Sequence, residues 1–227
     1  MVRHSLLIFI IVVAFLHLQA QRVELMFSAG RAGYAMGDLK KMNADLQVQI
    51  PFSTQITTNF PMTWQLGGHF AVQLSNKYKI GVLYAWNSTG SRIASSDYSG
   101  SYRFDNIVTG HTIGMLNGFR IYDYHSLRVD LEANIGLVAS FLKLNEEMNV
   151  ADTTFSSTAH YSAFGFFIEP RAVVSYQLKY FKAGFFIGYF VNSGGKIRNE
   201  DGEKSTTTIN WSGLRFGIEF GIHQINR

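Results

Sequence analysis

The sequence has no cysteine in its 227 residues. This absence excludes disulfides, thiolate metal sites and cysteine nucleophiles, and it also excludes a lipid anchor on an N-terminal cysteine. Charged residues are scarce too, at 16%, compared with about 25% in typical soluble domains. The formal net charge of +4 comes from basic residues that are scattered singly, so the sequence argues against a nucleic-acid-binding surface.

Long apolar runs are absent from the chain after its N-terminal segment. In that part of the sequence, no stretch of about 18 apolar residues could form a membrane-spanning helix. Apolar residues are nevertheless plentiful, at 47%, and aromatic residues reach 15%. They are therefore dispersed along the chain, as a membrane β-barrel requires when lipid-facing and interior-facing side chains alternate. There are only 3 prolines. One of them, Pro170, lies inside an expected strand, where it predicts a bulge or a missing ladder bond.

Residues 1–20 have the pattern of a secretory signal peptide. Arg3 and His4 precede a nearly continuous apolar run from Leu6 to Leu18, and the small residue Ala20 follows. This run of about 13 residues is too short to span a bilayer comfortably. We therefore expect cleavage after Ala20 and a mature domain over residues 21–227, and an uncleaved anchor is the alternative.

From Val23 onward the dominant hydrophobic period is two, which indicates strands. In the last segment apolar residues from Leu214 to Ile222 alternate with Gly or charged residues. The stretch from Leu127 to Phe141 keeps one parity throughout. It is longer than the usual globular strand of about 5–6 residues and suits a tilted bilayer crossing.

Turn signals divide the chain into eight expected strands. Short turns are expected at 75–77, 123–126 and 178–180, and they alternate with long polar connections at 37–61, 89–110, 145–160 and 193–206. The expected strands are Val23–Met36, Thr63–Leu74, Tyr78–Ser88, His111–Tyr122, Leu127–Leu144, Tyr161–Gln177, Phe181–Asn192 and Ile209–His223. This alternation predicts an all-β, eight-stranded antiparallel up-and-down transmembrane β-barrel with short periplasmic turns and long extracellular loops. A soluble periplasmic barrel is the architectural alternative.

Aromatic residues at the strand ends favour the membrane architecture. The tryptophans lie at strand ends beside long connections, and two tyrosines lie near short turns. From Tyr78 to Trp86 a tilted strand covers roughly 20 Å of height, close to the apolar thickness between two aromatic girdles. The expected girdle residues are Trp64, Tyr78, Trp86, Tyr176 and Trp211.

With these features the chain resembles the outer-membrane β-barrel domain family, the small barrels similar to OmpX and to the transmembrane part of OmpA. The resemblance covers residues 22–227 and includes the terminal aromatic strand Leu214–Ile222. It extends loosely to an uncharacterised subgroup, through Gly37–Asn43, Ser88–Ile93, Asp97–Gly100 and Asn210–Gly213. The resemblance implies the outer membrane of a diderm bacterium, with outer-membrane lipid and the barrel-assembly machinery as partners.

Charged residues of both signs share the parity assigned to the barrel interior. An isolated buried ion costs several kcal/mol, so we expect these charges to pair. An eight-stranded barrel is only wide enough for side chains to fill it. This width favours a structural plug of paired charges, and a narrow channel that conducts protons or ions is the alternative. The expected network comprises Glu24, Arg120, Arg128, Asp130, Glu132, Glu169, Arg171, Lys182, Arg215 and Glu219, with His69 beside it.

One arrangement suggests an enzyme. His160 and Ser162 are two residues apart and so share a face, which resembles the His-x-Ser motif of a lipid A deacylase. Catalysis also needs an orienting acid, and no acidic residue falls on the adjoining apolar parity. The favoured function is thus a non-enzymatic barrel with a structural or surface-interaction role and no cofactor, and a lipid-modifying hydrolase is the alternative.

Two features of the long connections bear on partners. Residues 38–46 could form a short helix over the barrel mouth, because Leu39, Met42 and Leu46 share one side. The connection 89–110 is rich in Ser, Tyr and Gly and could extend two strands as a hairpin. Together with 145–160 it is the place where we expect an extracellular protein or glycan to bind.

Overall fold

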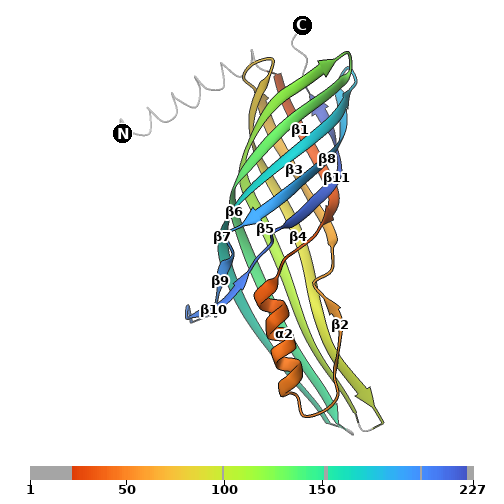
Figure 1. Ribbon diagram of the computed structural model, residues 1–227, viewed down its shortest axis with the longest axis vertical. Helices are drawn as coiled ribbons and strands as arrows, with labels where there is room; N and C mark the ends of the chain where they lie inside the picture. Colours follow the sequence, from red (N-terminus) through yellow and green to blue (C-terminus); the bar gives the residue numbers. More distant parts are fainter. Residues whose placement is uncertain (1–21, 99, 151–152, 200, 224–227) are drawn as a thin grey trace, which may run out of the picture.

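A computed structural model describes residues 22–98, 100–150, 153–199 and 201–223 (Figure 1). The predicted signal peptide at 1–20 lies outside these residues. Within the described ranges no helix has the length and apolar character needed to cross a membrane.

Eight antiparallel strands form a closed ring, which confirms the predicted fold class (Figure 1). The ring closes where β1 pairs with β11, with Phe27 opposite Phe220. Each strand otherwise pairs with its neighbours in chain order. The ring strands are β1 (Arg22–Ala32), β3 (Thr63–Gln73), β4 (Tyr78–Asp97), β5 (Gly100–Tyr124), β6 (Leu127–Val150), β7 (Thr153–Gln177), β8 (Phe181–Asn192) and β11 (Gly213–His223).

The two ends of the barrel differ as predicted. Short turns join β3 to β4, β5 to β6 and β7 to β8 at one end, where β1 also begins and β11 ends. We call this the short-turn end. The opposite end carries the connections predicted to be long, and we call it the hairpin end.

At the hairpin end, two of the connections expected as loops are continuations of the barrel strands. β4 and β5 stay paired up to Asp97 and Gly100, and β6 and β7 stay paired up to Val150 and Thr153. These four strands have 20, 25, 24 and 25 residues, about twice the 9–11 that cross a bilayer. The hairpin predicted over 89–110 is therefore present, and residues 145–160 form a second one.

The other two connections hold smaller elements. The first contains α2 (Gly37–Gln49), slightly longer than the helix predicted at 38–46, and β2 (Gln55–Asn59), which pairs with β4. The fourth contains β9 (Gly195–Arg198) and β10 (Lys204–Ile209). The expected strand 23–36 ends at Ala32 because Met36 has a left-handed backbone (φ 46°) that turns the chain into α2. Its expected partner, 209–223, correspondingly begins at Gly213.

Side chains alternate between the outside and the interior along most of each ring strand, with a register shift between Arg120 and Tyr122 on β5. On β6, Leu131, Ile135 and Leu137 are exposed, whereas Asp130 and Asn134 are buried. Pro170 faces outward, and the β7–β8 ladder has no recorded pair at 169 and 170, in line with the predicted missing bond. A closed ring with an apolar outside and a polar inside has the side-chain distribution of a transmembrane barrel.

Candidate functional site: the filled lumen and the sheet beyond it

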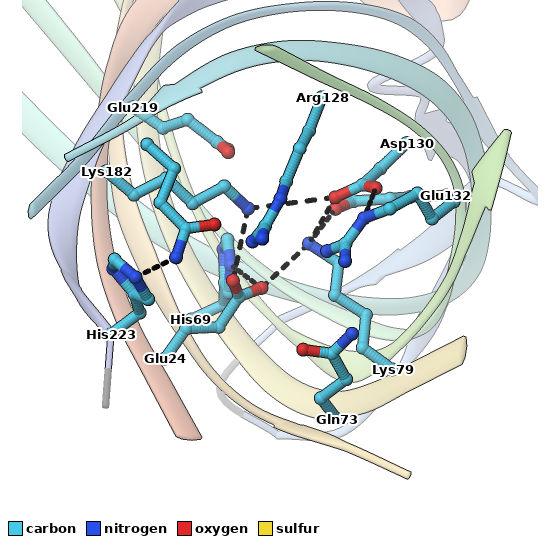
Figure 2. Close-up of polar contacts among 12 residues, drawn as sticks. Glu24, His69, Gln73, Lys79, Arg128, Asp130, Glu132, Lys182, Glu219 and His223 are labelled. Atoms are coloured by element: carbon cyan, nitrogen blue, oxygen red, sulfur yellow. Dashed lines mark hydrogen bonds and ion pairs between the residues drawn. The ribbon is translucent and has the colours of Figure 1, made fainter. Parts of the chain in front are cut away.

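A network of opposite charges fills the lumen near the short-turn end (Figure 2). Lys79 lies at its centre, with Nζ 2.7 Å from carboxylate oxygens of Glu24 and Glu132. Lys182 Nζ lies 3.1 Å from the other oxygen of Glu24, and both lysines are within 4 Å of Asp130. Four strands thus contribute charges that neutralise one another away from water.

Two further groups extend this network. Arg171 donates a hydrogen bond to Glu132 and lies 3.5 Å from Glu219, so it continues the network along the lumen. Towards the turn, Arg120 binds Asp130 at 3.1 Å. Arg128 contacts Asp123 at 3.4 Å in the more exposed rim.

Lys79 is absent from the residues predicted for this network, although it contacts three of its carboxylates, those of Glu24, Asp130 and Glu132. It follows the girdle residue Tyr78 and has the same parity as Ala85 and Asn87, both of which are buried. The alternation along β4 therefore indicates that Lys79 faces the lumen.

A second layer of polar groups lies between the charged network and the hairpin end. Arg215 is fully buried and stacks on Phe190, with its guanidinium carbon 3.4 Å from the ring centroid. Glu169 accepts a hydrogen bond from Asn134 at 3.1 Å. The predicted residues Glu169 and Arg215 thus lie in the lumen, and no ion pair between them is recorded among the described residues.

An apolar cluster, which the sequence did not predict, closes the lumen at the hairpin end. Trp211 is buried there (1% exposed), makes an edge-to-face contact with Tyr34 and donates its indole N–H to Ser140 at 2.8 Å. Leu39 brings α2 into the same cluster. The prediction that Trp211 belongs to the aromatic girdle is therefore wrong. The chain turns inward after β10, and the indole fills the mouth of the barrel.

The other predicted girdle residues face outward. Trp64 (60% exposed), Trp86 and Tyr176 are exposed, and Tyr78 is half-buried beside the short turn. The hydroxyl of Tyr78 donates to Asn117 at 3.0 Å. These positions give an aromatic residue near each end of the outward apolar band.

His160 and Ser162 lie on the outward face of β7, as their parity predicts. Ser162 is opposite Phe141 on β6 and Arg198 on β9. The described residues give no hydrogen bond between His160 and Ser162 and no carboxylate paired with His160. The geometry therefore assembles no nucleophile, base and orienting acid of the kind that hydrolysis needs.

Beyond the barrel, β4 to β7 form a sheet with its own polar contacts. Arg92 binds Asp105 through two hydrogen bonds of 2.6 and 3.0 Å. Tyr102 donates to Glu146 at 3.1 Å, and burial together with this carboxylate raises the pKa of Tyr102 to about 12. We call this region, residues 88–97, 100–110, 145–150 and 153–161, the outer sheet.

The two edges of the outer sheet differ. On the β4 side, β2 pairs with residues 91–94. On the β7 side, pairing away from β6 begins only at Ser162, so residues 153–161 have no strand beside them among the described residues. Most of these nine residues are exposed, which leaves a free edge of backbone N–H and C=O groups.

Comparisons with known proteins give the following results. No protein-family model matches the chain, and no curated protein matches it. Among solved structures, the chain is similar to the outer membrane protein OprG of Pseudomonas aeruginosa (11% identity, 91% of this chain and 96% of that chain, TM-score 0.45). It is also similar to Ail, the attachment invasion locus protein of Yersinia pestis (11% identity, 90% and 99%, TM-score 0.39), and to the N-terminal β-barrel domain of Pseudomonas aeruginosa OprF (11% identity, 89% and 97%, TM-score 0.38).

These structural neighbours are small outer-membrane β-barrel proteins. The chain's own strand pairing and its outward apolar face establish the architecture independently: it is an eight-stranded antiparallel transmembrane β-barrel.

Proposed function

We propose that this protein is a non-enzymatic surface-interaction protein of the outer membrane, exported by a cleaved signal peptide, whose barrel anchors the outer sheet outside the cell. The observation that carries the proposal is the length of β4 to β7, which run about twice as far as a bilayer requires. A protein that served only as a membrane plug would not need this sheet.

The free edge of β7 is where we propose that a partner binds. Exposed sheet edges pair readily with another extended chain, and natural proteins usually block them. Here the β4 edge is covered by β2 whereas residues 153–161 are left open. A partner segment in extended conformation can add to this edge through backbone hydrogen bonds, with side chains on alternate residues supplying specificity.

The filled lumen supports an anchor in preference to a channel. The charged network occupies the lumen near the short-turn end, and the Trp211 cluster occupies the hairpin end. Planar-bilayer recordings of the purified protein should therefore show no conductance above background. A steady single-channel conductance would contradict the anchor role.

The binding role is tested by selecting displayed linear peptides against the protein in lipid nanodiscs. Selected peptides should show a preference on alternate residues, and Ser156→Lys/Thr158→Lys should abolish their binding, because edge lysines discourage strand addition. The matched control is Thr57→Lys/Asn59→Lys on β2, which should leave binding unchanged. Peptides that bind the edge variant as well as the unmodified protein would refute this site.

A further inference from the structure

The outward face of the barrel is hollowed over β1, β3 and β4. The hollow is a groove of about 650 Å³ with Gly68 at its floor. Phe27 and Tyr84 flank this glycine on the neighbouring strands, and Leu66 and Phe70 lie above and below it on β3. The groove therefore exists because an outward position that should carry a side chain has none.

Gly68 is constrained to be glycine by its backbone contacts. A Cβ at this position would lie 2.6 Å from the carbonyl oxygen of Met26 on β1, closer than any real Cβ contact. The lining is apolar, and the hydroxyl of Tyr84 is turned to His111, with 2.8 Å between its oxygen and Nδ1. The groove therefore offers a mainly apolar surface to a ligand.

One cation lies over the hairpin-end side of this groove. Arg31 has the same outward parity as Phe27 on β1 and lies opposite Trp64. Its guanidinium is 5.4 Å from the Trp64 ring centroid and donates one hydrogen bond to the carbonyl of Met62 at 2.8 Å. The remaining N–H groups of Arg31 have no recorded partner among the described residues, so they are available to an anion.

The spacing of these features matches a lipid. Arg31 on β1 lies opposite Trp64 on β3. Trp64 is four residues from Gly68 along β3, and this spacing corresponds to about 13 Å at the usual rise per residue. Trp64 and Trp86 mark the interfacial zone at the hairpin end, where lipid headgroups lie. The groove extends from there into the hydrocarbon region, and arginine recognises phosphate groups through paired N–H donors.

We propose that this groove binds one acyl chain of lipid A in the outer leaflet, and that Arg31 binds a phosphate of its headgroup. The occupant is a lipid because the groove lies in the membrane-embedded band. It is anionic because, among the described residues, the charge beside the groove is the positive one of Arg31. The assignment to the outer leaflet rests on the proposed orientation, with the outer sheet outside the cell, but it does not depend on a partner at the β7 edge.

The test uses the full-length mature protein in nanodiscs of phosphatidylcholine that contain a small fraction of lipid A. Native mass spectrometry then counts the lipid A molecules retained after release from the disc. The unmodified protein should retain one lipid A, and Arg31→Gln should weaken retention about tenfold, the loss of one charge-assisted hydrogen bond. Lys143→Gln is the matched control, because Lys143 is an outward cation on β6 away from the groove, and it should retain lipid A normally.

A second variant separates the acyl-chain site from the phosphate site. Val82→Trp fills the groove from an exposed position, so it should reduce retention even with Arg31 in place, and folding is checked by heat-modifiable gel migration. If Val82→Trp does not fold, Ile113→Trp on β5 replaces it, since Ile113 also lines the groove. Equal retention by Arg31→Gln and the unmodified protein, or equal retention of phosphatidylglycerol in place of lipid A, would overturn the proposal.

Discussion

The ammonium group of Lys79 lies 2.7 Å from a carboxylate oxygen of Glu132, although β5 separates their strands in the ring. Lys79 reaches across β5 over Gly118, where a Cβ would lie 2.6 Å from Cε of the lysine. The central ion pair of the lumen therefore depends on the absence of a side chain at position 118.

Replacing this glycine should break the network. Gly118→Leu would displace Lys79 from its carboxylates, and separating a buried charge from its partners costs about 3–5 kcal/mol. We expect a clearly lower urea midpoint for unfolding, measured by gel migration in lipid vesicles. Gly37→Ala is the control, because nothing lies within 4 Å of a Cβ there. An unchanged midpoint for Gly118→Leu would show that the network contributes little to stability.

The three tryptophans should report two environments. Trp211 is buried beside Tyr34 and Ser140, whereas Trp64 and Trp86 face outward. In vesicles of brominated lipid, a variant that keeps only Trp211 (Trp64→Phe/Trp86→Phe) should fluoresce almost unquenched. A variant that keeps only Trp64 (Trp86→Phe/Trp211→Phe) should be strongly quenched. Equal quenching of the two would place Trp211 at the lipid, as the sequence pattern suggested.

The contact between α2 and β10 should weaken in acid. Asp38 accepts hydrogen bonds from the backbone N–H and the hydroxyl of Thr208, at 2.9 and 2.6 Å. These bonds hold the pKa of Asp38 below its usual 3.8. A lowered folded-state pKa means that the stabilisation is complete above pH 3.8 and is lost as the pH falls through the folded value.

A spin label on α2 can follow this change. With the label at Val48, which is exposed, mobility should stay low from neutral pH down to about pH 4 and rise below it. Asp38→Asn should remove most of that pH dependence. If the label loosens equally in both proteins, another group controls α2.

The outward pair on β7 allows a direct test of the hydrolase alternative. Ser162 has no recorded hydrogen bond to His160, and no carboxylate orients the imidazole among the described residues. Ser162→Ala should therefore leave the acylation pattern of lipid A in producing cells unchanged, as determined by mass spectrometry. A loss of deacylation on this substitution would establish an enzyme in place of an anchor.

The alternation of apolar and polar residues predicted the barrel, because one set of alternate side chains faces outward and the other set faces the lumen. The odd-numbered residues from Leu127 to Phe141 face outward in the structure as predicted, and the short turns lie where Asn76 and Lys179 indicated. The same parity rule also places Lys79 in the lumen, because Lys79 belongs to the expected strand Tyr78–Ser88 and shares the parity of Ala85 and Asn87, which are buried.

Other features depend on tertiary contacts that parity does not encode. Trp211 follows an outward-facing pattern in sequence but turns into the barrel mouth, where the Tyr34 ring and the Ser140 hydroxyl are available. Polar residues at 145–160 suggested a loop, because a strand outside the membrane has no lipid-facing side and therefore lacks the apolar–polar alternation that identifies a membrane strand. Their pairing with β5 and β7 partners appears only in the folded sheet.

The central claim is that one end of a membrane-spanning barrel carries a sheet outside the cell. Because the chain has no cysteine, single substitutions can be labelled without background. Tyr98→Cys reports the tip of the outer sheet, and Asn76→Cys and Lys179→Cys report the short-turn end.

The most direct measurement is the labelling of these variants in intact cells with a membrane-impermeant maleimide. Tyr98→Cys should react in intact cells, whereas Asn76→Cys and Lys179→Cys should react only after the outer membrane is permeabilised. Labelling of all three sites in intact cells, or release of all three variants as freely soluble protein, would contradict the transmembrane anchor.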